Sequence, residues 1–372
     1  MSSIKKRPGA KMYTARWREY PGGPQKTRLF KKKEDGTNFL KTVDYQLLTG
    51  VYVPPEGGLI SLREFSEEWW GRRTRAPSTE DRVARELKLH ILPPFGHRPI
   101  GTIRKPDIEK WAKNLTLAPS NLAPSSAQMV YETLKSILAC AVGDGRLSTN
   151  HADKAWLTPI DKVPFVPLTV DQVHAITDGM RDDMKAAVVV AAGTGLRQGE
   201  LFGLTVDRVD FLRMTLNVDR QLFTPSKGRP FFKPPKGAPK CLNGYRTITL
   251  NGMLVEVLAA HLAQFGPGED GIIFHNTVGR GVVRSDGGKY MREATKRAGV
   301  EATWHDLRHY HATELLSEGV NPALVAERLG HDLKTLLTTY AHVMPKDEDR
   351  VREILDRSLG KSAEVWLRSK AV

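Results

Sequence analysis

Cysteine is scarce in this sequence, which contains only Cys140 and Cys241, far apart and in no CxxC pattern. A disulfide framework or a thiolate zinc site is therefore not expected, and a reducing cytosol fits. No run approaches the roughly 18 apolar residues of a membrane span, and the first residues lack the apolar core of a signal peptide. We therefore expect a cytoplasmic protein without a membrane partner.

The composition is otherwise that of a folded chain with a marked basic excess. Its 372 residues are 40% hydrophobic and 26% charged, enough for two or three domains with cores of their own. The 56 Lys and Arg outnumber the 42 Asp and Glu, leaving +14. Such a balance favours binding to a polyanion, because basic side chains neutralise phosphates and release condensed counterions. Nucleic acid is the first candidate, and an acidic membrane surface is the second.

More than half of this excess lies in residues 1–53, where twelve Lys and Arg face four acids. Alternation through Tyr13, Ala15 and Trp17, followed by a Pro-Gly-rich turn at 21–24, predicts a hairpin, and apolar spacing over 39–47 predicts a helix. We expect a basic sheet-plus-helix module over residues 1–55. Its candidate DNA contacts are Lys5, Lys6, Arg7, Arg16, Arg18, Lys26 and Arg28.

Two capping-box signatures open the remaining domains. Ser61 with Glu64 begins a helical domain over 59–158, and Thr169 with Gln172 begins a mixed, mainly helical domain over 166–345. The second of these carries strand patterns at 214–222 and 245–250, and a helical tail follows over 346–372. The predicted fold class is multidomain, mainly α with small β-sheets (α+β).

The third domain holds an ordered set of chemically distinctive residues. Arg197 follows a glycine-bounded turn, His305 and Arg308 share one helix face at i and i+3, and His331 precedes Tyr340 by nine residues. Taken singly, each has an ordinary structural explanation, such as a surface ion pair or a packed tyrosine. No such ordinary explanation accounts for all of them together in this order.

In these motifs the sequence resembles the tyrosine recombinase family of phage integrases, whose catalytic domain shows Arg…Lys…His-x-x-Arg…His…Tyr. The matching words are Thr194-Gly195-Leu196-Arg197, His305-Asp306-Leu307-Arg308-His309, Leu329-Gly330-His331 and Thr339-Tyr340-Ala341-His342. The resemblance continues into the second domain, which looks like a core-binding (SAM-like) domain, and covers about residues 59–345. The first module resembles, on charge and position, the arm-type DNA-binding domain of longer integrases.

The resemblance implies a role for each catalytic residue. Arg197 and Arg308 hold the scissile phosphate, and Tyr340 is the nucleophile. His305 is the favoured general base, and His331 orients the phosphate or the nucleophile. Lys236, with Lys240 in reserve, protonates the leaving 5′-oxygen.

The chemistry of these side chains suits the assignment. Planar, permanently charged guanidiniums match phosphate oxygens, and a phenol with a pKa of about 10 needs help to lose its proton at neutral pH. Asp306 and His309 are expected to support the helix and the surroundings of the catalytic residues without taking part in the chemistry, and Glu200 is expected to hold an arginine in place.

The implied function is site-specific recombination: DNA strands are cleaved and rejoined through a 3′-phosphotyrosyl intermediate, so that a mobile element or viral genome is integrated or excised. A type IB topoisomerase and a non-catalytic DNA-binding regulator are the alternatives. No cofactor is expected, since His305, His309 and His311 lack an HExxH or carboxylate companion and no Walker motif occurs.

The resemblance also implies a setting and partners. These are double-stranded DNA attachment sites, a homotetramer on DNA, DNA-bending and directionality factors, and the cytoplasm or nucleoid of a bacterial host. The tail either docks on a neighbouring protomer or packs on its own domain.

Overall fold

The structure is a computed structural model that describes residues 2–6, 8–50, 52–54, 56–72, 74, 76–153, 166–225, 228–236, 245–344 and 348–370. The chain forms two compact units, Met1–Val163 and Pro164–Val372. Both are mainly helical with small sheets, which confirms the predicted fold class. The domain boundaries near 55–59 and 345–346 remain predictions. The junction expected at 158–166 falls largely on residues 154–165, outside the described part.

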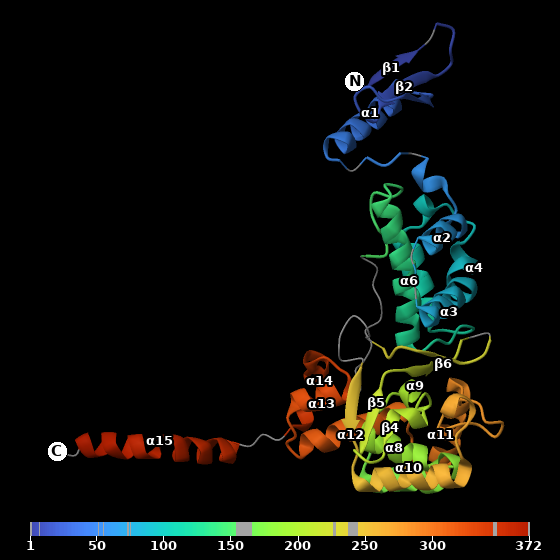
Figure 1. Ribbon diagram of the computed structural model, residues 1–372. Coiled ribbons are helices and arrows are strands. Elements are labelled where there is room, and N and C mark those ends of the chain that lie inside the picture. Colours follow the sequence, from blue (N-terminus) through green and yellow to red (C-terminus); the bar gives the residue numbers. More distant parts are fainter. Residues whose placement is uncertain are drawn as a thin grey trace. The chain divides into compact units, whose positions relative to one another are not determined.

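The first unit opens with an antiparallel sheet of β1 (Ser3–Lys6), β2 (Tyr13–Arg18) and β3 (Gln25–Phe30), in that order, against which α1 (Lys33–Leu48) packs (Figure 1). Its small core consists of Ala15, Trp17, Leu40 and Val43. The expected hairpin and helix are confirmed, while β1 was not predicted. Because side chains alternate across a strand, Ala15 and Trp17 face α1 and the residues between them form the opposite, open face.

The rest of this unit is a helical bundle with its own core. The elements are η1 (Gly57–Leu59), α2 (Leu62–Gly71), α3 (Pro77–Glu86), the π-helical turn η2 (Leu87–Ile91), α4 (Leu92–Phe95), η3 (Ile100–Thr102), α5 (Lys105–Leu115) and α6 (Pro124–Gly143). The predicted Ser61–Glu64 capping box is present, with both reciprocal hydrogen bonds. The core is built around buried residues of α2, α5 and α6, among them Phe65, Trp69, Trp111 and Ile137.

The second unit packs helices against a small sheet. Its first elements are α7 (Val170–Gly179), α8 (Asp182–Thr194), α9 (Gln198–Leu201), η4 (Val206–Arg208), β4 (Val209–Asp210), β5 (Thr215–Val218), β6 (Gln221–Phe223), β7 (Phe231–Lys233) and β8 (Arg246–Thr249). The sheet order is β4-β5-β8, while β6 and β7 form a separate hairpin. The strand predicted over 214–222 is therefore wrong as a single element, because β5 and β6 belong to different sheets. The capping box at Thr169 and Gln172 is confirmed.

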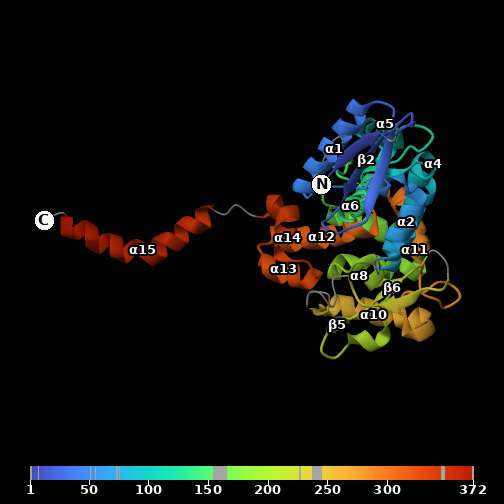
Figure 2. The ribbon, with the colours of Figure 1, turned by 90° about the horizontal axis from the view of Figure 1, so that it is seen from above.

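The remaining helices are α10 (Gly252–Phe265), η6 (Glu269–Gly271), α11 (Arg284–Ala298), α12 (Trp304–Ser317), α13 (Pro322–Leu329), α14 (Leu333–Tyr340), η7 (Ala341–Val343) and α15 (Glu348–Lys370). Helix α8 packs against α7, α10 and α12. Figures 1 and 2 show α13 and α14 beside α12, and a small core of α12–α14 side chains joins the three.

The predicted helical tail is present as α15, and its apolar residues Val351, Ile354, Leu355 and Leu359 remain exposed. Among the described residues, no helix is long and apolar enough to cross a membrane.

Candidate active site

Arg197 is positioned by the sharp end of α8. Gly195, at φ +65°, terminates that helix, and Arg197 then becomes the N-cap of the short helix α9. The Glu200 carboxylate accepts a hydrogen bond from the Arg197 backbone N–H at 3.0 Å and another from its Nη1 at 2.8 Å. Nη2 donates to the Gly330 carbonyl at 2.8 Å. The guanidinium is thus fixed from both sides, with 19% of its side chain exposed.

Arg308 lies on α12 and is 1% exposed. Its Nη1 donates to the Gly195 carbonyl and its Nη2 to the Leu329 carbonyl, both at 2.6 Å, and Nη2 lies 2.9 Å from Nε2 of His331. Burial and the charge of Arg197 lower its pKa to about 9, which still leaves it protonated at neutral pH. Its Nε is buried without a hydrogen-bond partner among the described residues. The Nε–H of this guanidinium can therefore still donate a hydrogen bond.

His331 follows the αL residue Gly330, which ends α13 at φ +65°. Burial, followed by the charges of Arg308 and Arg197, lowers its pKa to about 3. The ring is therefore neutral at neutral pH. When Arg308 donates to Nε2, the ring proton must sit on Nδ1. The turn from Leu329 to His331 is accordingly held by both arginines, through two carbonyls and one imidazole.

A buried ion pair lies behind Arg197. Nη2 of Arg246, on β8, is 2.7 Å from Oε2 of Glu200, and both side chains are almost fully buried. Burial alone would raise the pKa of Glu200, but the charges and hydrogen bonds of Arg246 and Arg197 outweigh it and lower the pKa to about 2. Arg246 also donates through Nε to the carbonyl of Arg328 at 2.7 Å. The sheet is thereby tied to α9 and to the end of α13.

Tyr340 is the last residue of α14 and is 1% exposed. Its hydroxyl lies 2.6 Å from Nδ1 of His309, and the two rings are 5.6 Å apart. Burial raises its pKa to about 12, although the charge of Arg308 acts in the opposite direction. In this structure the phenol is protonated and shielded from solvent.

His305, on α12, and Lys236, three residues after the end of β7, differ from the buried site residues in their exposure. Both side chains are exposed. Partial desolvation lowers the pKa of His305, followed by the charge of Arg308, and Lys236 is among the other cations that act in the same direction. Lys236 is therefore within electrostatic reach of the site. Lys240, the reserve candidate, lies outside the described residues.

The structure thus brings together Arg197, His305, Arg308, His331 and Tyr340, with Lys236 nearby. Two further residues take part in these contacts. His309, interpreted as support for its helix and for the surroundings of the catalytic residues, lies at hydrogen-bond distance from the Tyr340 hydroxyl. Arg246 drew no prediction beyond its strand, although it binds Glu200. The i, i+4 spacing places His309 beside His305 on α12 but does not predict the contact with Tyr340.

The basic residues of the N-terminal sheet divide between its two faces. By register, Lys5 and Arg16 lie on the open face with Arg18, whose side chain bonds the Gly23 carbonyl. Lys26 and Arg28 lie on the α1 face, where Lys26 pairs with Glu19 at 2.6 Å and Arg28 stacks on Phe39. Lys6 lies 5.2 Å from the ring centre of Tyr13. Arg7 lies outside the described residues.

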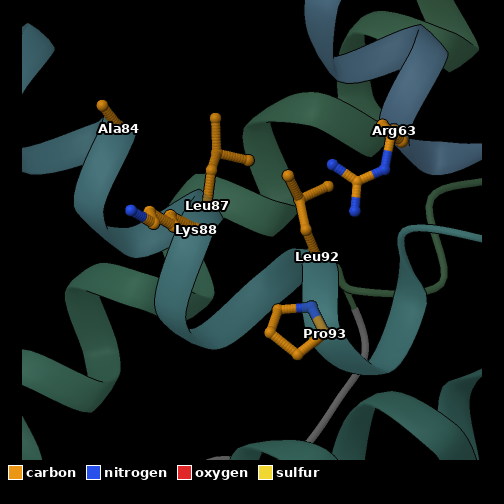
Figure 3. Close-up of a pocket in the computed structure, with 6 residues that line it drawn as sticks. All are labelled: Arg63, Ala84, Leu87, Lys88, Leu92 and Pro93. Carbon is orange, nitrogen blue, oxygen red and sulfur yellow. The ribbon is translucent and has the colours of Figure 1, made fainter.

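The helical part of the first unit has a hollow of about 260 Å³. In Figure 3, Leu87 and Leu92 lie between the charged side chains of Lys88 and Arg63. Ala84 and Pro93 complete the lining. The charged groups of this described lining are those of Arg63 and Lys88, and the rest of it is apolar.

Two protein-family models match the chain. The Phage integrase family model matches residues 167–347, and the model for the phage integrase N-terminal SAM-like domain matches residues 61–116. A XerC-like tyrosine recombinase of Caldanaerobacter subterraneus is 29% identical over 248 residues, which are 60% of this chain and 63% of that protein.

Two solved structures share the fold. The Tn1549 transposon integrase in complex with transposon right end DNA matches with a TM-score of 0.68 at 23% identity, covering 79% of this chain and 98% of that one. A lambda integrase tetramer bound to a Holliday junction matches with a TM-score of 0.58 at 17% identity, covering 90% of this chain and 94% of that one.

Proposed function

Because this chain belongs to the phage integrase family of tyrosine recombinases and is a site-specific DNA recombinase of mobile elements, we propose that it cleaves DNA through a covalent 3′-phosphotyrosyl bond to Tyr340. One observation carries the proposal. Arg197 and Arg308 both bind the turn from Leu329 to His331. His309, on the same helix as Arg308, lies at hydrogen-bond distance from the Tyr340 hydroxyl.

The two guanidiniums would stabilise the charge that develops on the nonbridging oxygens of a five-coordinate phosphorus. Preorganised donors are effective there because they need no reorientation during the reaction, and losing one commonly costs about 10²- to 10³-fold in rate. The buried Arg308 keeps its Nε–H unpaired among the described residues, and His331 presents a neutral ring beside it. These groups suit the oxygens of a phosphodiester.

Lys236 would protonate the leaving 5′-oxygen. It lies three residues after the end of β7, and its charge is among those that lower the pKa of His305. An exposed cation could approach a leaving group on the side opposite to Tyr340, as in-line displacement requires. Lys240 remains the alternative donor.

A suicide substrate nicked beside the cleavage site tests the nucleophile. The wild-type chain should accumulate a covalent protein–DNA adduct, and Tyr340→Phe should form none while it still binds the same DNA. An adduct that persists in Tyr340→Phe, or none with any cognate site, would contradict the proposal. Exchange of strands between two duplexes, as opposed to relaxation of supercoils alone, separates a recombinase from a topoisomerase.

The sites and partners are proposed by family analogy. The chain would act on double-stranded attachment sites, with the basic N-terminal sheet binding arm-type DNA and DNA-bending and directionality factors assisting. The lambda integrase match is a tetramer bound to a Holliday junction, and we propose a homotetramer for this chain as well. The exposed apolar stripe of α15 would dock on a neighbouring protomer.

A further inference from the structure

We propose that His309 accepts the phenolic proton of Tyr340 when the tyrosine attacks DNA. The inference rests on the proposed function, because it takes Tyr340 as the nucleophile. It differs from the expectation that His305 is the general base, and it assigns chemistry to a residue that was expected to support its helix and the surroundings of the catalytic residues without reacting itself.

The contact geometry favours His309. Its Nδ1 lies 2.6 Å from the Tyr340 hydroxyl oxygen, which is hydrogen-bond distance to the atom that must react. His305, one helical turn earlier, packs its ring edge-on against His309, with centres 4.5 Å apart. The three rings thus form a row in which His309 stands between His305 and Tyr340.

The resting pair is neutral, and this fixes the direction of the hydrogen bond. The pKa of Tyr340 is raised to about 12 by burial, and that of His309 is lowered to about 4 by burial and by the charge of His305. The phenol therefore donates, Nδ1 accepts, and the ring proton of His309 sits on Nε2. Transfer becomes favourable only as the phenol oxygen bonds to phosphorus, because an aryl ester oxygen holds a proton far less strongly than a phenolate.

The step balances without another reactant. A lone pair of the Tyr340 oxygen forms the new O–P bond, and the pair of the P–O5′ bond leaves with the 5′-oxygen. The phenolic proton passes to Nδ1 of His309, while the 5′-oxygen takes its proton from the lysine proposed above. In rejoining, the 5′-hydroxyl gives its proton back to the neutral lysine as its oxygen bonds to phosphorus, and the His309 imidazolium returns the phenolic proton to the leaving tyrosine oxygen.

Single-turnover cleavage of the nicked suicide substrate by full-length variants tests the role. His309→Ala removes the acceptor. His309→Asn keeps an oxygen acceptor near the position of Nδ1 but cannot take a proton at neutral pH. Both should cleave about 10²- to 10⁴-fold more slowly than the wild type, the range expected for loss of a general base. The exposed His174→Ala is the control histidine.

A more acidic nucleophile supplies the decisive signature. Ring-fluorinated tyrosine at position 340 should recover much of the loss in both His309 variants, because it needs less help to give up its proton. Full-rate cleavage by His309→Asn, or no recovery with the fluorinated tyrosine, would overturn the inference. Thermal midpoints and binding to core-site DNA exclude a folding defect as the cause.

The design separates this inference from the proposed function. A wild-type chain that forms no adduct with cognate DNA overturns both. A wild-type chain that forms the adduct while His309→Ala forms it equally fast overturns the inference alone.

Discussion

The carboxylate of Glu200 is the counterion of two arginines at once, and this makes it a structural requirement of the site. It hydrogen-bonds Arg197, which it holds in line with the 329–331 turn, and it pairs with the buried Arg246. Replacing a buried ion pair as a whole can be neutral, whereas removing one partner leaves an uncompensated charge. Replacing Glu200 alone is therefore more informative than replacing both members of the ion pair.

Glu200→Gln should destabilise the second unit by about 3–5 kcal/mol, because it leaves Arg246 buried without its carboxylate. It should also slow cleavage, because Arg197 loses its support. Thermal or urea unfolding measures the first effect and the suicide substrate the second. Asp182→Asn, which breaks the exposed pair with Lys185, is the matched control and should leave both nearly unchanged. Equal stability of Glu200→Gln and the wild type would contradict the prediction.

His311 should make stability depend on pH. Burial and the charge of Arg328 lower its pKa to about 4, from about 6.5 in the unfolded chain. Between these two pH values the unfolded state therefore binds more protons than the folded state. The contribution of His311 to the free energy of unfolding is complete above about pH 6.5 and is lost as the pH falls toward 4. His309 and His331, with pKa values of about 4 and 3, act in the same direction.

The measurement is the thermal midpoint between pH 7.5 and pH 5. It should fall for the wild type and fall less steeply for His311→Gln, which removes one of the three titrating rings. A midpoint that rises as the pH is lowered would show that the histidines are not buried in the neutral form.

At the scale of elements, the site depends on two helix ends that meet. The end of α8 supplies the Gly195 carbonyl to Arg308, and the end of α13 supplies those of Leu329 and Gly330. Gly195 ends α8 at φ +65°, and a Cβ there would come within 2.6 Å of Leu329 and 2.7 Å of His311. Gly299 ends α11 at the same φ, with nothing within 4 Å.

Gly195→Ala and Gly299→Ala therefore form a matched pair. Both variants should lose about 1–2 kcal/mol in free energy of unfolding, because alanine disfavours the left-handed backbone. Only Gly195→Ala should lose more, because its Cβ collides with Leu329 and His311. It should also slow cleavage, because the collision displaces the carbonyl that Arg308 binds. Unfolding and single-turnover cleavage check the two effects. Equal behaviour of the two variants would mean that the contact at Gly195 does not control the site.

The sequence predicted where helices and strands lie better than it predicted which of them pack or pair with one another. Capping residues and apolar periodicity act within a few residues, and the boxes at Ser61 and Thr169 appeared as expected. The run 214–222 looked continuous because both β5 and β6 contain apolar residues, and only pairing with β8 and β7 separates them. The contact of His309 with Tyr340 joins residues 31 positions apart through the placement of α14 against α12, which periodicity does not encode.

Across the whole molecule, the positive charge concentrates in the N-terminal module. The open face of its sheet carries Lys5 and Arg16, whereas Lys26 and Arg28 are engaged on the α1 face by Glu19 and Phe39. Contacts to phosphates come from cations that a duplex can reach, and each one adds to the salt dependence of binding. The two pairs of residues carry the same charge and differ in the face they occupy.

Lys5→Ala/Arg16→Ala should weaken binding to arm-type DNA and lower the slope of log K against log salt by about 0.9 for each phosphate contact removed. Lys26→Ala/Arg28→Ala, the control of equal charge, should change binding less, because those cations already have partners. Deleting residues 1–53 should abolish integration on full-length sites and spare cleavage of a minimal core site. Equal recombination by the truncated chain on full-length sites would refute arm binding, and equal loss in the two double variants would refute the assignment to the open face.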